Sequence, residues 1–209
     1  MTSENPWLRI PVEDYEGHMS HEKVGQLQAL NIIFKSVLNL SQGKKICVLG
    51  CTSGNGFEYI DTDKVEKVVG IDINSEYLNV LEKRYGSRIP NLKLICDDII
   101  KVKIPAKSFD LIHGALIFEY VDYVTILIKI TKWLKIKGML AIVLQLPDES
   151  PPVSESPYES LELLSPVINL IEPESFCSAA KEVGLKKISG YEYDLKTGKK
   201  FFVGYFKKL

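Results

Sequence analysis

The sequence lacks three features that would assign it to large classes of protein. It has no apolar run near the roughly 18 residues that a membrane span requires, so no membrane partner is expected. It has no basic excess, since 26 Lys and Arg face 27 Asp and Glu, and this balance disfavours nucleic acid as a partner. Its first residues show no basic-then-apolar signal pattern, which favours a cytoplasmic protein.

Cysteine and histidine are also scarce, with four and three residues. The cysteines form no CxxC pair, and free thiols in a reducing cytoplasm are the simplest interpretation. His18 and His21 stand close together without further ligands, and two histidines alone rarely hold zinc. We therefore predict no metal site.

Short apolar runs alternate with amphipathic segments along most of the chain. Strands are predicted at 45–50, 67–72, 92–97, 109–113, 139–146, about 186–195 and 199–207. Helices are predicted at 22–40, from 74 or 75 onward, from 122 to near 138, and at 173–184, whereas 1–21 is expected to be irregular. This order favours a doubly wound α/β fold: a mostly parallel, seven-stranded, Rossmann-like sheet with an antiparallel C-terminal strand.

The chain is expected to form a single domain, 1–209. Residues 1–43 would supply an N-terminal lid and helix, and 44–146 the cofactor-binding core. Residues 147–172 are rich in proline and are expected to form a long substrate loop with a short helix at 159–164. Residues 173–209 would form the last helix and hairpin.

The first strand leads into a glycine-rich turn, Gly50-Cys-Thr-Ser-Gly-Asn-Gly56. A dinucleotide fingerprint needs G-x-G-x-x-G, but Thr52 stands where the middle glycine would be, so a pyrophosphate would meet a side chain. Asp72 ends the second strand 22 residues after Gly50, at the position where a carboxylate can hold a ribose. Alternatively, the turn is an ordinary connection and Asp72 is a helix cap.

Two more carboxylates, Asp97 and Asp98, end the third strand. One of them can accept a hydrogen bond from an adenine amino group while Ile99 packs against the ring, or the pair caps the following turn. Because the ends of parallel strands meet at one edge of a sheet, the turn and these carboxylates together favour an adenosine-containing cofactor.

Residues 44–209 resemble the class I S-adenosylmethionine-dependent methyltransferases, of the small-molecule type with a methyltransferase type 11/25-like domain. The resemblance is carried by ICVLGCTSGNG, VVGID, LICDDI, FDLIHGALIFEYV, LKIKGML and the terminal hairpin. It implies S-adenosylmethionine as cofactor, S-adenosylhomocysteine as product and an activity in class EC 2.1.1. By position, it implies a cofactor site with four parts. The methionine and ribose part is lined by Gly50, Cys51, Ser53 and Gly54, and the ribose is held by Asp72. The adenine is surrounded by Ile73, Asp97, Asp98 and Ile99, and the floor beneath the sulfonium is formed by Gly114, Ala115 and Phe118.

The chain departs from that family at two positions. Val48 replaces a usual acidic residue, and Thr52 replaces a usual glycine. The N-terminal segment could compensate, or the chain could bind the cofactor weakly or be a non-catalytic relative.

Methyl transfer is an in-line displacement, so the protein mainly has to align and desolvate the reactants. We expect Tyr15, His18 and Tyr120 to touch the cofactor or the acceptor, although the tyrosines could simply pack and His18 could be solvated. Glu119 and Gln145 are further candidates near the transferable methyl, whereas His113, within the fourth strand, is more readily a core residue.

The favoured function is methyl transfer to a small molecule, with 1–40 and 147–172 forming a lid over the site. The protein would be a monomer or homodimer. An NAD-dependent oxidoreductase is the less favoured alternative, because the Thr52 spacing and the final hairpin oppose it. A non-catalytic binding or scaffold protein with this fold stays open because of Val48.

Overall fold

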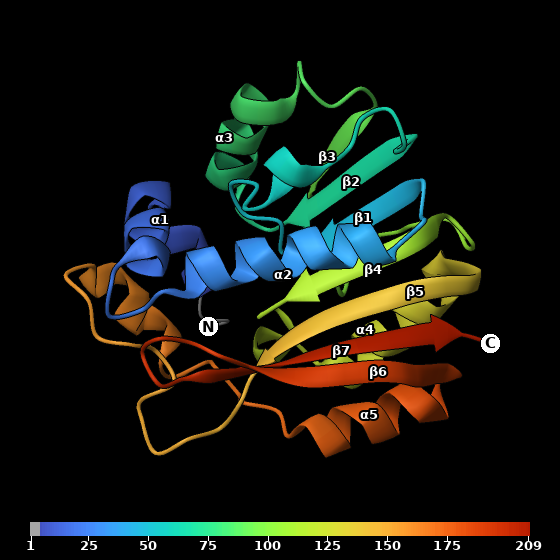
Figure 1. Cartoon of the computed structure of the whole chain (residues 1–209). Coiled ribbons are helices and arrows are strands. Elements are labelled where there is room, and N and C mark those ends of the chain that lie inside the picture. The colour runs from blue at the N-terminus through green and yellow to red at the C-terminus, as the bar shows by residue number, and fades with distance from the viewer. Residues whose placement is uncertain (1–4) are drawn as a thin grey trace.

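The computed structural model describes residues 5–209 and contains one seven-stranded sheet with strand order β3-β2-β1-β4-β5-β7-β6 (Figure 1). Strand β7 is antiparallel to both of its neighbours, β5 and β6, and the pairs among β1 to β5 are parallel. The predicted doubly wound fold is therefore confirmed. The strands are β1 (Lys45–Leu49), β2 (Lys67–Asp72), β3 (Leu92–Cys96), β4 (Phe109–Ala115), β5 (Leu134–Gln145), β6 (Leu185–Asp194) and β7 (Lys200–Lys208).

Helices cover both faces of the sheet. α2 (Gln26–Leu40) and α3 (Ser75–Tyr85) pack on one face, and α4 (Tyr123–Trp133) and α5 (Pro173–Glu182) pack on the other. Alternate residues of β1 therefore enter different cores, with Val48 on the α2 side and Leu49 on the α4 side. Burial on both faces explains why the central strands read as nearly continuous apolar runs.

The N-terminal segment is more regular than its sequence predicts. Residues expected to be irregular form η1 (Pro6–Arg9) and α1 (Val12–Ser20). The buried side chains of α1 are Val12, Tyr15, His18 and Met19, which share one face of the helix. Tyrosine and histidine are poor markers of an apolar stripe and Gly17 lowers helix propensity, so the pattern is weak in the sequence.

The predicted end of the helix that begins near Asp122 is wrong. Helix α4 ends at Trp133 instead of near Gly138, because Leu134 already pairs with Phe109 and begins β5. The glycine-rich turn leads into the short 3-10 helix η2 (Phe57–Tyr59).

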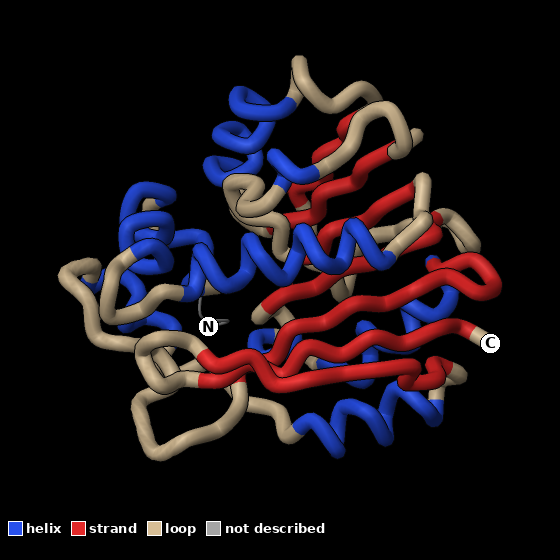
Figure 2. Tube along the Cα trace, in the orientation of Figure 1, coloured by secondary structure: helices blue, strands red, loops and turns tan. Residues whose placement is uncertain are grey.

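The carboxyl ends of the parallel strands lie on the left in Figure 1, where α1 and η4 (Glu159–Leu164) also lie. Residues 147–172 form a long connection whose only helix is η4 (Figure 2). This connection packs on α1: the Ser160 hydroxyl donates a 2.6 Å hydrogen bond to Asp14, and a Cβ on Gly17 would collide with the Tyr158 ring. Both segments thus cover the edge where the parallel strands end.

Within residues 5–209, no helix is both long and apolar enough to cross a membrane. All four cysteines are unbonded, with Cys47 and Cys51 buried in the sheet.

Candidate functional site

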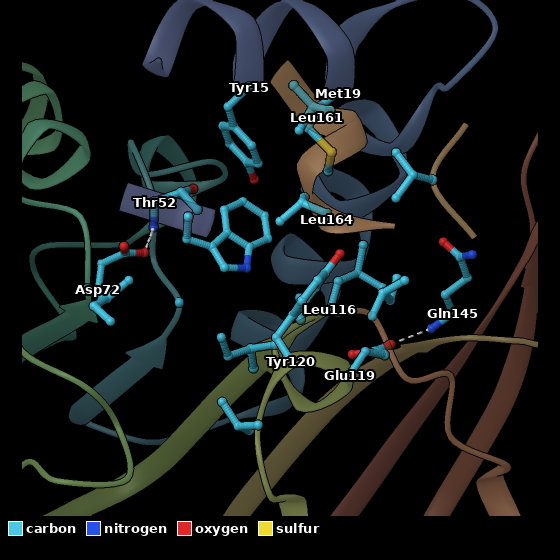
Figure 3. Close-up of a pocket in the computed structure, with 18 of the residues that line it drawn as sticks. Tyr15, Met19, Thr52, Asp72, Leu116, Glu119, Tyr120, Gln145, Leu161 and Leu164 are labelled. Atoms are coloured by element: carbon cyan, nitrogen blue, oxygen red, sulfur yellow. Dashed lines mark hydrogen bonds between the residues drawn. The ribbon is translucent and has the colours of Figure 1, made fainter. Parts of the chain in front are cut away.

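A cavity opens at the carboxyl ends of the parallel strands, with a volume of about 130 Å³ (Figure 3). One part of its wall is polar and consists of strand ends. The other part is an apolar lobe closed by α1, η4 and the turn after β4. The polar wall contains Gly50, Thr52, Asp72, Ile73, Asp97, Asp98 and Ile99, and the apolar lobe contains Met19, Leu30, Leu116, Val153, Leu161, Leu164 and Ile168.

The glycine-rich turn has a left-handed backbone at every second residue. Gly50, Thr52, Gly54 and Gly56 have φ values of 61°, 44°, 89° and 85°. This alternation explains the glycine spacing, because glycine adopts positive φ without steric cost. Thr52 is the exception, since a β-branched residue is strained in this conformation.

Asp72 joins the turn to the end of β2. Its two carboxylate oxygens accept hydrogen bonds from the backbone N–H of Thr52 (2.8 Å) and of Asn74 (2.9 Å). Burial raises the pKa of Asp72 above its usual value, and the two N–H groups partly offset this rise. Each oxygen retains a second lone pair, so Asp72 fixes the turn and can still accept from a ligand on the cavity side.

At the end of β3, two carboxylates also accept backbone N–H groups and line the cavity. Asp97 accepts the N–H of Asp98, and Asp98 accepts the N–H of Ile100, each at 2.8 Å. Both carboxylates also line the cavity with Ile99 beside them. The capping interpretation and the binding interpretation therefore describe the same residues and are compatible.

Five predicted cofactor residues do not line this cavity: Cys51, Ser53, Gly54, Gly114 and Phe118. The Ser53 hydroxyl donates to Glu16 of α1, and Gly54 lies against Leu81 and Tyr85 of α3.

Gly114 lies under the Phe118 ring, which a Cβ there would touch. Phe118 itself packs in the core on the α4 side, 5.0 Å from the ring of Phe176. Of the three residues expected beneath the sulfonium, only Ala115 reaches the cavity.

The three residues predicted to be catalytic all line the cavity. Burial raises the pKa of Tyr15 to about 12 and raises the pKa of Tyr120 further, so both phenols are hydrogen-bond donors at neutral pH. Burial lowers the pKa of His18 to about 4, and its Nδ1 lies 2.8 Å from the Ser156 hydroxyl. His18 is therefore neutral at pH 7 and bonded to the 147–172 connection.

His113 and Val48 are core residues. Strands β4 and β1 pair His113 with Val48, and the imidazole stacks on Phe34 at 4.8 Å. No carboxylate is therefore available at the position of Val48. Glu16 of α1 instead brings a carboxylate to the glycine-rich turn, where it accepts from Ser53 and pairs with Arg84.

Trp7 lines the cavity and was not identified from the sequence as a site residue. Its ring makes edge contacts with Tyr15 (centroids 6.1 Å apart) and Tyr120 (5.1 Å), and its buried Nε1 has no partner among residues 5–209. The Trp7 carbonyl accepts from Asn74, which attaches η1 to the end of β2. No local periodicity marks this residue, because η1 is a single turn.

Glu119 and Gln145 form the floor of the apolar lobe (Figure 3). Glu119 Oε1 accepts the backbone N–H of Gln145 at 2.8 Å, whereas Oε2 is buried and has no partner in the part of the chain that the structure describes. Burial raises the pKa of Glu119 to about 7. The Gln145 side chain bonds to Gln26 (3.3 Å) and to the Pro152 carbonyl (2.9 Å).

Among residues 5–209, no cluster of His, Cys, Asp and Glu could hold a metal ion.

Comparison with known proteins gives a family match that lies over this site. Residues 47–142 match a family model described as a methyltransferase domain. This range contains the glycine-rich turn, Asp72, the Asp97–Ile99 segment and Glu119. No curated protein matches the sequence.

Solved structures with the same fold cover most of the chain. The N-methyltransferase NodS from Bradyrhizobium japonicum WM9, solved with S-adenosyl-L-homocysteine, is 13% identical with a TM-score of 0.71, over 98% of this chain and 99% of that one. An S-adenosylmethionine-dependent methyltransferase from Methanosarcina mazei is 17% identical with a TM-score of 0.61, over 79% and 92%. The [4+2]-cyclase SpnF is 11% identical with a TM-score of 0.69, over 86% and 80%. At these identities the likeness shows the fold alone.

Proposed function

We propose that this chain, a member of the class I S-adenosylmethionine-dependent methyltransferase family by its fold and its methyltransferase domain, methylates a small-molecule acceptor. The observation that carries the proposal is the continuity of the cavity. Its polar wall of strand ends has the groups that suit a nucleoside, and it runs directly into the apolar lobe. We call the apolar lobe, together with Glu119 and Gln145, the acceptor lobe.

The polar wall fits the adenosyl part of the cofactor. Asp72 would accept from the ribose hydroxyls, Asp97 or Asp98 from the adenine amino group, and Ile73 and Ile99 would flank the ring. Gly50 leaves room at the turn, because a Cβ there would lie against Ile117. The predicted role of Ser53 would require α1 to shift, since Ser53 donates to Glu16, and that of Gly54 would require α3 to shift, since Gly54 lies against Leu81 and Tyr85.

The chain's own contribution to the reaction is alignment and exclusion of water. When bound, S-adenosylmethionine supplies a methyl group that its sulfonium already activates. The rings of Trp7, Tyr15 and Tyr120 would face this cation, because aromatic faces attract positive charge. The N-terminal segment and the 147–172 connection would exclude water, because both contribute to the cavity wall and bond to each other.

The size of the cavity supports a small acceptor. η4 and α1 close the acceptor lobe with Met19, Leu161 and Leu164, so only a compact, largely apolar molecule fits without opening this cover. The division of the chain into lid, core, substrate loop and hairpin remains a proposal on the same grounds.

Calorimetry with S-adenosylhomocysteine tests the cofactor site. The wild-type protein should bind this product and not NADH, and Asp72→Ala should weaken binding by about 10- to 100-fold, the typical cost of hydrogen bonds to a charged group. Asp61→Ala is the matched control, since Asp61 is an exposed carboxylate in a turn outside the cavity. Equal affinity in the Asp72 variant, or no binding at millimolar concentration, would refute the proposal.

Transfer of labelled methyl from S-adenosylmethionine to a pool of small metabolites separates an enzyme from a binding protein with this fold. The distinction needs the measurement, because a protein named as a cyclase shares the fold. Binding of S-adenosylhomocysteine together with label in an extractable small molecule is the expected result. Binding without any transfer would favour the non-catalytic alternative.

A further inference from the structure

The Oε2 atom of Glu119 is a buried acceptor that the fold itself does not use. The Glu119 side chain is 1% exposed, and Oε1 alone holds β5 through the Gln145 N–H. Oε2 has no hydrogen-bond partner in the described chain, and Glu119 is one of the residues that line the cavity. Leaving a buried oxygen unpaired costs about 1–3 kcal/mol. Glu119 needs only Oε1 to hold β5, so the unpaired Oε2 is a cost that the fold itself does not explain.

The charged side chains that line the cavity are acidic. Its lining, taken from residues 5–209, includes four carboxylates and no lysine or arginine. Lys199 is nearby, but its ammonium donates to the Pro151 and Pro152 carbonyls at 2.7 Å each. His18 is neutral at pH 7, because burial lowers its pKa to about 4. Within residues 5–209, no cation therefore neutralises Glu119.

We propose that Glu119 Oε2 binds the nitrogen of an amine acceptor with an apolar body and takes the proton that this nitrogen must lose before methylation. The proposal rests on the proposed methyl transfer and names its acceptor class. A buried carboxylate is stabilised best by a paired cation, and the leucines of η4 would hold the apolar body. An alcohol would leave the negative charge unpaired, and an acid would be repelled.

The proton and electron balance is simple. The ammonium group transfers one proton to the Glu119 carboxylate and becomes a neutral amine. The nitrogen lone pair then forms the new N–C bond while the C–S bond breaks and sulfur keeps the electron pair, so the product leaves as a methylated ammonium ion. Glu119 returns its proton to water. A carboxyl whose pKa is about 7 accepts this proton more readily than an ordinary carboxylate does.

Three probes of the same shape test the proposal by calorimetry in the presence of S-adenosylhomocysteine: phenethylamine, 2-phenylethanol and phenylacetate. We expect wild-type protein at pH 8 to bind the amine at least 10-fold more tightly than either other probe. Glu119→Gln should remove this preference and leave the affinity for S-adenosylhomocysteine unchanged, because its amide oxygen can still accept the Gln145 N–H. Glu58→Gln, a carboxylate outside the cavity, should behave as wild type.

The pH dependence of the wild-type protein gives a second measurement that does not depend on any variant folding. The ammonium stays charged between pH 6 and 8, whereas Glu119 ionises as the pH rises through about 7. Amine affinity should therefore rise over this range. Among residues 5–209, the other titratable groups that face the acceptor lobe are Tyr15 and His18 from α1 and Tyr120 beside Glu119. Their pKa values lie far outside this range.

Equal binding of the amine and the alcohol, an unchanged preference in Glu119→Gln, or no amine binding at millimolar concentration would overturn the proposal. Amine preference without affinity for S-adenosylhomocysteine would instead refute the proposed methyl transfer and leave the amine site in place.

Discussion

Thr52 has a φ of 44° in a turn where the other three left-handed residues are glycines. A left-handed β-branched residue costs about 1–2 kcal/mol, because its Cβ crowds the following carbonyl oxygen. Its N–H also donates to Asp72, so the strained residue holds the carboxylate that we assign to the ribose.

Thr52→Gly should therefore be neutral or stabilising by up to about 1 kcal/mol, since relief of strain exceeds the entropy cost of glycine. Gly50→Ala is the reverse change, because it adds a Cβ to a left-handed residue with a φ of 61°. It should lower the free energy of unfolding by about 1 kcal/mol or more. Urea unfolding of both variants measures these effects. A Thr52→Gly variant less stable than Gly50→Ala would show that the threonine side chain is needed for the turn.

At the scale of elements, α1 and the 147–172 connection act as one cover because they pack on each other. Gly17 permits this contact, since a Cβ there would come within 2.2 Å of the Tyr158 ring. Helix propensity alone favours alanine over glycine inside a helix by about 1 kcal/mol, so propensity and packing make opposite predictions for this position.

Gly17→Ala should destabilise the wild-type protein, because Tyr158 has to move. In a Tyr158→Ala background the same change should stabilise it by up to about 1 kcal/mol, because only helix propensity remains. A double-mutant cycle by urea unfolding checks this reversal of sign. If Gly17→Ala stabilises both backgrounds equally, α1 and the connection do not pack as described.

Sequence patterns predicted the sheet and the polar wall because these depend on local periodicity. A buried strand ends where its apolar run ends, so Asp72 and Asp97 could be assigned to neighbouring strand ends before any coordinates. The cover could not be predicted in this way. Trp7 and Leu161 reach the cavity from segments without a regular repeat, and Phe118 turns into the opposite core. Their positions depend on long-range packing.

For the whole molecule, the structure joins two parts that the sequence keeps far apart. Strand ends from the first half of the chain provide the polar wall, and α1 and η4, from opposite halves, close the acceptor lobe. We therefore propose that one cavity holds the adenosyl group of the cofactor at the polar wall and presents the cofactor's sulfur to the acceptor lobe. Its position at the carboxyl ends of the strands agrees with the general location of ligands in open α/β sheets.

A crystal structure with S-adenosylhomocysteine bound tests this claim most directly. We expect the ribose hydroxyls within hydrogen-bond distance of Asp72, the adenine beside Ile99, and the sulfur facing the lobe that contains Glu119. A nucleoside bound elsewhere, or one whose ribose makes no contact with Asp72, would contradict it.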